Sequence, residues 1–222
     1  MLPLILIIDF ISITTIFLIS LFFDLKFRRI PNRALKIFFL LGLILNFLEF
    51  SVFYKKFLLF LILKILIFFF IFLISMILFS LRIIGGGDGK LIILVFIIHP
   101  IKYLNFDFVI SFFLLFSLFF LTLFILNFLF NYIVNNCYSF DILFNLDLNI
   151  NSLKRLYFKM FFRFFNLSEI KKFQGYKKLL KSQAILYNYI KKKFQLFVQY
   201  RPPLVFICML AYYSVVFLKI VI

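Results

Sequence analysis

Residues 57–90 of the chain read FLLFLILKILIFFFIFLISMILFSLRIIGGGDGK. The first part, residues 57–81, is apolar apart from Lys64 and two serines. As an α-helix with a rise of about 1.5 Å per residue, this run is longer than the ~30 Å hydrocarbon core of a membrane. A glycine-rich segment with one acid, Asp88, follows it closely. The stretch therefore predicts a membrane-spanning helix that ends near a candidate reactive group.

The rest of the chain has the same apolar character. Of its 222 residues, 66% are hydrophobic and 40 are phenylalanine, and the mean hydropathy is +1.17. The core of one soluble domain cannot bury this many large apolar side chains. The composition indicates a membrane protein, and it excludes soluble enzyme folds, collagen and disordered chains.

Apolar runs divide the chain into six candidate spans. They are residues 2–23, 35–53, 57–81, 91–104, 108–130 and 204–222. The fourth run is the weakest, because its 14 residues contain Pro100 and reach only about 21 Å as a helix. A re-entrant or tilted segment is the alternative there. The expected fold class is an all-α polytopic membrane protein with about six transmembrane helices.

Basic residues gather at the ends of the apolar runs. The chain has 25 Lys and Arg against eight Asp and Glu, which gives a net charge of +17. By the positive-inside rule, the loops after the first and third spans and the segment 131–203 are cytoplasmic, and both termini face outward. We therefore expect a multi-pass protein of the cell membrane that contacts anionic lipids and binds no nucleic acid.

Two of the eight acids stand at the expected cytoplasmic edge of the membrane. Asp24 closes the first span, and Asp88 lies seven residues past the end of the third. Two carboxylates a few ångströms apart share a proton, so that one deprotonates water while the other polarises a peptide carbonyl. The pair is therefore a candidate aspartyl-protease dyad. The alternative is that both acids only mark interfacial loops.

The neighbours of the two acids favour the first interpretation. Four glycines around Asp88 leave room for another backbone, so we expect a loop against which an extended substrate lies. A plain flexible loop is one alternative, and a phosphate-binding loop is a poor one, since the GxxxxGK[ST] spacing is absent. The further site residues that we expect are Gly85, Gly86, Gly87, Gly89 and Lys90 from this segment, and Ile30, Pro31 and Asn32 after the first span.

Together the two segments resemble the type IV prepilin peptidase and archaeal preflagellin peptidase family of GxGD intramembrane aspartyl proteases. The shared motifs are D-(x)5-IPN after the first span and GxGDxK after the third, and the likeness covers roughly the first 130 residues. The resemblance implies that Asp24 and Asp88 are catalytic. It also implies cleavage of a short basic leader, next to glycine or alanine, from pilin-like or archaellin-like precursors at the cytoplasmic membrane face.

The likeness is to a minimal form of that family. The bifunctional bacterial members carry CxxC pairs in an N-terminal cytoplasmic domain and also methylate the new N-terminus. This chain begins in its first span, and its two cysteines, Cys137 and Cys208, form no such pair. We therefore expect no methyltransferase activity, and no metal or cofactor. The single histidine, His99, is expected at the membrane interface rather than in a metal site, since no further ligands are spaced to help it.

On this interpretation the chain has three regions. These are a transmembrane catalytic core of five spans (1–130), a basic cytoplasmic insert of uncertain fold (131–203) and a final transmembrane helix (204–222). Apolar residues recur in the insert at helical spacing, which predicts an amphipathic helix on anionic lipid. They are Leu153, Leu156, Tyr157, Met160, Phe161 and Phe164. Ser168 is expected to cap a second helix. Contact with an acidic secretion partner is the open alternative for the insert.

Charged residues inside the spans support other functions that remain open. We expect Lys64 to pair with an acid such as Glu49 or to snorkel, and Asp9 to pair with a hydroxyl such as that of Ser12 or Thr14. A small ion-coupled transporter would instead use Asp9 and Glu49 near the membrane centre. A non-catalytic assembly scaffold would need no acid. A presenilin-like protease is also considered, but the chain lacks the PAL motif of that class.

Overall fold

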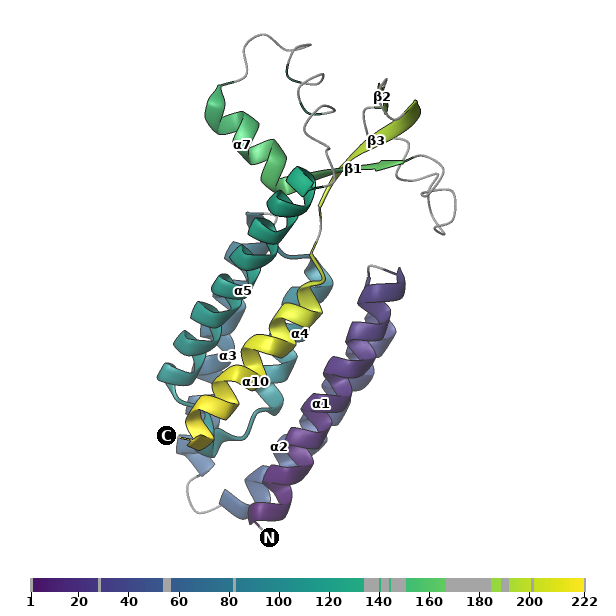
Figure 1. Ribbon diagram of the computed structural model, residues 1–222. Coiled ribbons are helices and arrows are strands. Elements are labelled where there is room, and N and C mark those ends of the chain that lie inside the picture. Colours follow the sequence, from purple (N-terminus) through teal and green to yellow (C-terminus); the bar gives the residue numbers. More distant parts are fainter. Residues whose placement is uncertain are drawn as a thin grey trace. The chain divides into compact units, whose positions relative to one another are not determined.

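The computed structural model describes most of the chain (Figure 1). The described residues are 2–27, 29–53, 57–81, 83–133, 140, 144, 151–166, 185–188, 192–200 and 202–221. Contacts divide the chain into two compact units. One unit comprises Met1–Phe119 with Pro203–Ile222, and the other comprises Phe120–Pro202.

Long apolar helices make up most of the first unit. They are α1 (Leu2–Phe27), α2 (Asn32–Phe53), α3 (Phe57–Ser80) and α5 (Phe106–Ile133), of which α5 continues into the second unit. Each contains a stretch that is long and apolar enough to cross a membrane. Many of their large apolar side chains are exposed, as expected of helices surrounded by lipid rather than water. The prediction of an all-α polytopic membrane protein is confirmed.

Helix α4 (Gly86–Ile98) is shorter than its neighbours. Its 13 residues extend about 20 Å, which is less than the membrane core. It packs against α2 and α3, and seven of its residues are buried, so it lies inside the unit rather than at a lipid-facing surface. Pro100 disfavours helical geometry at the residue before it, and α4 ends there. A 3₁₀ turn, η2 (Ile101–Tyr103), then leads to α5.

The bounds expected for the fourth span were therefore wrong. The helix begins at Gly86, within the glycine segment, and ends at Ile98 instead of continuing past Pro100. The glycines were interpreted as a loop because of their low helix propensity. Helix α4 packs against α2 and α3 despite that cost, and at Gly89 a side chain would not fit against Ser75 of α3 without a shift.

The last helix, α10 (Leu204–Val221), returns to the first unit and packs against α1 and α4. Its buried side is formed mainly by small or β-branched residues such as Val205, Ala211 and Val215. Tyr212 is fully buried, and its ring lies 5.7 Å from that of Phe17 on α1. Segments from opposite ends of the chain thus share one interior.

The second unit contains α7 (Ser152–Phe161) and a three-stranded antiparallel sheet. The strands are β1 (Phe162–Asn166), β2 (Ile185–Asn188) and β3 (Lys193–Gln199), in the order β1-β3-β2. Phe164 of β1 lies opposite Phe197 of β3 and is buried against Phe140 and Phe144. The sequence predicts helices in this insert, and the sheet is a feature that its pattern does not indicate.

The amphipathic helix predicted in the insert is confirmed only as far as Phe161. Phe164 was wrongly placed on it, because residues 162–166 alternate between the two faces of a strand and pair with β3. A short apolar segment is compatible with both the helical and the strand repeat, and pairing with another strand decides between the two structures. The helix expected after Ser168 lies outside the described residues.

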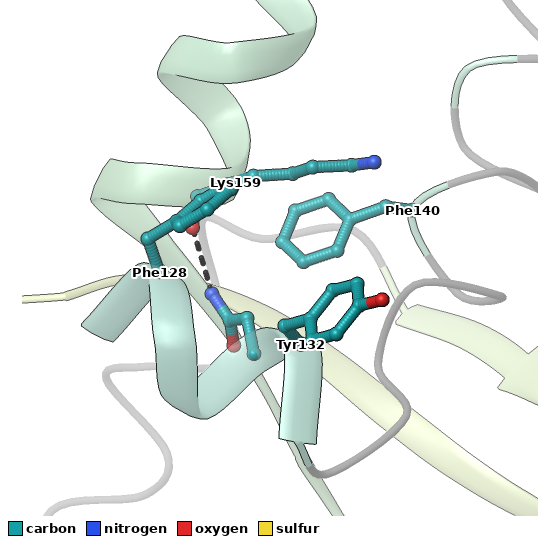
Figure 2. Close-up of a pocket in the computed structure, with 5 residues that line it drawn as sticks. Phe128, Tyr132, Phe140 and Lys159 are labelled. Atoms are coloured by element: carbon teal, nitrogen blue, oxygen red, sulfur yellow. Dashed lines mark hydrogen bonds between the residues drawn. The ribbon is translucent and has the colours of Figure 1, made fainter. Parts of the chain in front are cut away.

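Two asparagines of α5 hold the corner between α7 and β1. Asn127 Nδ2 donates to the carbonyl of Met160 at 2.8 Å, and Asn131 Nδ2 donates to those of Lys159 and Phe162, each also at 2.8 Å. These bonds satisfy carbonyls that the end of α7 leaves without helical partners. A pocket of about 170 Å³ lies beside this corner (Figure 2). It is lined by Phe128, Asn131, Tyr132, Phe140 and Lys159.

Candidate active site

Asp24 lies in the last turn of α1 and is buried, with only 8% of its surface exposed. Its neighbours Leu25 and Phe27 are more than half exposed, so Asp24 is on the inward side of the helix. Helix α1 packs against α10, α2 and α4. A carboxylate facing this interior is suited to chemistry rather than to contact with lipid headgroups.

Asp88 occupies the third position of α4, not the loop expected from the sequence. Its Oδ2 accepts a hydrogen bond of 3.1 Å from the backbone N–H of Gly85, the N-cap residue. A Cβ on Gly85 would lie only 2.8 Å from the same oxygen, so the absence of a side chain lets the carboxylate fold back over the helix start. One carboxylate oxygen thus orients the acid, as in a capping box.

The two acids, 64 residues apart in sequence, interact in the folded chain. Burial, and next the charge of Asp24, raise the pKa of Asp88 from 3.8 to about 6, while the Gly85 N–H opposes this shift. Asp88 lies in the first turn of α4, outside the four candidate membrane spans. A carboxyl with this pKa can hold a proton near neutral pH and donate it.

Cys208 of α10 is a third group in this region that the sequence analysis did not connect with the acids. It is fully buried and lies within electrostatic reach of both Asp24 and Asp88. A single cysteine in an apolar run carries no sequence signal for such a position. Helices α1, α4 and α10 contact one another, and they carry Asp24, Asp88 and Cys208 respectively.

The Ile-Pro-Asn segment contacts the glycine segment that precedes Asp88. Ile30 is buried, and its backbone and Cβ lie 3.7 Å from where a Cβ of Gly87 would stand, so the two motif segments touch. The carbonyl of Pro31 accepts a bond from the N–H of Leu35, which starts α2. Pro31 and Asn32 are themselves exposed.

The other glycines and Lys90 differ in their surroundings. Gly89 is buried, and a Cβ there would lie 2.5 Å from Ser75 Oγ of α3, which no real side chain tolerates. Gly86 is exposed, and its Cβ would meet only the Phe79 ring at 3.5 Å, an ordinary contact. Lys90 is exposed. The segment therefore combines one position of tight helix packing with an open edge beside Asp88.

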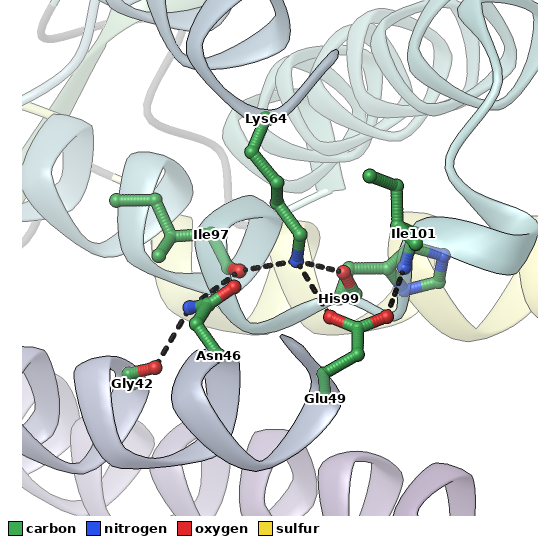
Figure 3. A network of polar contacts seen from close by, with 7 residues as sticks. All are labelled: Gly42, Asn46, Glu49, Lys64, Ile97, His99 and Ile101. Atoms are coloured by element: carbon green, nitrogen blue, oxygen red, sulfur yellow. Dashed lines mark hydrogen bonds and ion pairs between the residues drawn. The ribbon is translucent and has the colours of Figure 1, made fainter. Parts of the chain in front are cut away.

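A second polar cluster lies at the opposite end of α4 (Figure 3). Lys64 Nζ is 3.2 Å from Glu49 Oε2, which confirms the pairing expected for these residues. The hydroxyl partner expected for Asp9 is wrong. Both Asp9 oxygens are buried without a hydrogen bond among the described residues, while Thr14 donates to the Phe10 carbonyl.

The structure places His99 differently from the interfacial position expected for it, and brings it against α10. His99 is fully buried, not interfacial, and its Nδ1 lies 2.8 Å from the hydroxyl of Tyr212. Tyr213 donates to Thr14 Oγ1 at 2.6 Å. Both tyrosines thus form hydrogen bonds in addition to packing. Within the described part of the chain, no group of three His, Cys, Asp or Glu side chains could hold a metal ion.

The arrangement has a counterpart among known protein families. Residues 11–139, more than half of the chain, match the model described as the type IV leader peptidase family. The matched range begins within α1 and extends beyond the end of α5, so it includes both acids and the two motif segments. No curated protein and no solved structure matches the chain.

Proposed function

The chain belongs to the type IV leader peptidase family, and from this membership we propose that it is an aspartyl endopeptidase with Asp24 and Asp88 as its catalytic pair. It removes short leader peptides from pilin-like or archaellin-like precursors at the cytoplasmic face of the cell membrane. The observation that supports this assignment most directly is the electrostatic coupling of Asp24 on α1 with Asp88 on α4. Structural acids that only cap helices need no such partner.

The two acids divide the chemistry between them. Asp24, ionised, takes a proton from a water molecule as the water oxygen attacks the scissile carbonyl carbon. Asp88, protonated, donates a hydrogen bond to the carbonyl oxygen and stabilises the negative charge that develops there. The proton held by Asp24 then passes to the leaving amine as the C–N bond breaks. No step needs a metal or a covalent enzyme intermediate.

The open edge beside Asp88 is the place for the substrate. Gly85 has extended backbone geometry, with φ −79° and ψ 156°, and it is exposed. An extended peptide can lie against such a segment without meeting a side chain. This suits a substrate that is cut next to glycine or alanine.

The function is tested by supplying a pilin-like precursor with a basic leader to membranes that contain the chain. We expect a shorter product whose new N-terminus, read by N-terminal sequencing, lies next to a glycine or alanine. Membranes without the chain serve as the control. A range of leaders that all stay intact would count against the assignment.

The rate of cleavage is expected to fall as the pH rises through about 6. Asp88 acts in its protonated form, and that form is lost above its raised pKa of about 6. Each pH unit above this value removes about nine-tenths of the remaining protonated acid. The kcat/KM of the reconstituted protein between pH 5 and pH 8 gives the measurement, and a flat profile over this range would contradict the assigned roles.

Helix α7 is proposed to contact anionic lipid. Leu153, Leu156 and Tyr157 form an exposed apolar edge, and Lys154 lies on another face of the same helix. An apolar edge flanked by basic residues is typical of helices that lie in the headgroup region. Binding to anionic lipid explains why the insert is basic, and it does not require the insert to bind a leader peptide that is itself basic.

A tryptophan at Leu156 is expected to be quenched by lipids that carry bromine on their acyl chains. The chain contains no tryptophan, so Leu156→Trp reports this one position in reconstituted vesicles. Lys154→Trp, on another face, is the matched control and should be quenched much less. Equal quenching at both positions, or no difference between anionic and neutral vesicles, would refute the contact.

A further inference from the structure

Helix α4 ends inside the first unit, where its last carbonyl groups need partners. The final four C=O groups of a helix have no donors within it, and lipid offers none. The C-cap residue His99 is fully buried, and Pro100 prevents the helix from continuing. The structure must therefore supply donors from neighbouring helices at this point.

Lys64 of α3 supplies two of them. Its Nζ donates to the carbonyl oxygens of Ile97 and His99, each at 2.9 Å (Figure 3). Asn46 of α2 supplies one more donor: its Nδ2 also donates to the Ile97 carbonyl, at 3.1 Å. The ammonium charge also faces the negative end of the α4 dipole, which favours it further.

Glu49 of α2 holds the chain on the other side of the same break. Its Oε1 accepts a bond of 2.7 Å from the backbone N–H of Ile101, the first residue of η2. Its Oε2 is the partner of Lys64, and the side chains of Lys64 and Glu49 are only 12% and 3% exposed. We call these two residues the α4 clip.

The α4 clip and Asp88 lie at opposite ends of one short, buried helix. From Asp88 to Ile97 the distance along the axis is about 14 Å. A helix of this length, packed against α2 and α3, moves as a unit. A change in the contacts at its C-terminal end therefore shifts the first turn, which carries Asp88.

We propose that Lys64 and Glu49 are positioning residues, which set the place of Asp88 relative to Asp24 by holding the far end of α4. The consequence for catalysis rests on the proposed function, but the effect on the position of α4 does not. Neither residue touches the reacting groups. Their role is to complete a helix that is too short to reach its own partners at the membrane surface.

A charge reversal separates this role from that of a simple ion pair. In the Glu49→Lys, Lys64→Glu double variant the opposite charges remain paired. However, a carboxylate would then face the carbonyls of Ile97 and His99, and an ammonium would face the N–H of Ile101. If the clip acts by satisfying these backbone groups, the reversal must fail, whereas Lys64→Arg must retain function.

The position of α4 is measured first, without any substrate. Spin labels at Leu25→Cys and Lys90→Cys, both exposed positions, report the distance between α1 and α4 in the full chain with Cys137→Ser and Cys208→Ala. We expect one narrow distance distribution with Lys64 or Lys64→Arg. It should broaden or shift in Lys64→Met and in the charge reversal.

Kinetics on the unlabelled protein form the second arm. Lys64→Met is expected to lower kcat by about tenfold with little change in KM, since misplacing a catalytic group weakens only the chemical step. Unchanged distances in Lys64→Met, or full recovery by the charge reversal, would overturn the proposal. If Lys64→Met does not accumulate, Lys64→Arg and the reversal decide. Absence of cleavage by the wild type defeats the proposed function alone, because the distances still test the clip.

Discussion

Asp24→Asn and Asp88→Asn are each expected to lower leader cleavage by about 10³-fold or more, the largest effect of any single change in the chain. Asparagine has the shape of aspartate but cannot take a proton from water or give one to a carbonyl oxygen. Acid–base groups of this kind contribute about 10²–10⁴-fold each. Because the substrate's contacts remain, the loss should appear in kcat, with KM nearly unchanged.

The matched control for this loss is Asp9→Asn. Asp9 is on the same helix as Asp24 and is also buried, with 1% of its surface exposed. It lies 15 residues earlier, about 22 Å along the axis, and cannot reach the site. Precursor and product are followed by mobility shift in membranes with equal amounts of each variant. Cleavage that survives either dyad substitution would rule out the aspartyl mechanism.

The same comparison separates the alternative functions. An ion-coupled transporter would depend on Asp9 and Glu49, and a scaffold on no acid. In the structure Glu49 forms an ion pair with Lys64 and accepts a hydrogen bond from the Ile101 N–H, so both of its carboxylate oxygens make structural contacts. If the dyad variants function as well as the wild type in cells and Asp9→Asn does not, transport would be favoured over proteolysis.

Membrane architecture could be predicted from the sequence because hydrophobic length alone decides it. The pairing of Lys64 with Glu49 was predictable for a related reason, since an ammonium inside a span must find a partner. The hydrogen bonds from Lys64 to the carbonyls at the end of α4 could not be predicted, because they depend on the residue at which α4 ends. That point is decided by packing against α2 and α3 together with Pro100.

The geometry around Asp88 could not be predicted from the sequence. Glycine's poor helix propensity favours a loop around Asp88, yet the structure has the first turn of α4 there. His99 was misplaced because a polar residue beside proline is usually exposed, whereas Tyr212 and Phe108 enclose it here. The position of Cys208 near both acids arises from contact between the two ends of the chain, which no local pattern records.

Gly89→Ala is expected to lower cleavage by about 10²-fold, the second-largest effect, because either the buried Ser75 hydroxyl must rotate away or α4 must move away from α3. The added Cβ would stand 2.5 Å from Ser75 Oγ and 3.4 Å from the Ile84 side chain. Gly89 follows Asp88 directly, so the displacement moves the carboxyl that is proposed to be catalytic. A misplacement of about 1 Å costs on this order of rate.

Gly86→Ala is the matched control, since it adds the same methyl group to the same helical turn. At that position the Cβ meets only the Phe79 ring at 3.5 Å, so α4 keeps its place and activity should fall far less than in Gly89→Ala. Ser75→Ala should then rescue Gly89→Ala, because it removes the clashing oxygen and leaves the Ser75 Cβ 3.9 Å away. Cleavage assays on the two single variants and the double variant measure this rescue. Equal loss in Gly86→Ala and Gly89→Ala would mean that glycine flexibility, rather than the close approach of α4 to α3, is what the site requires.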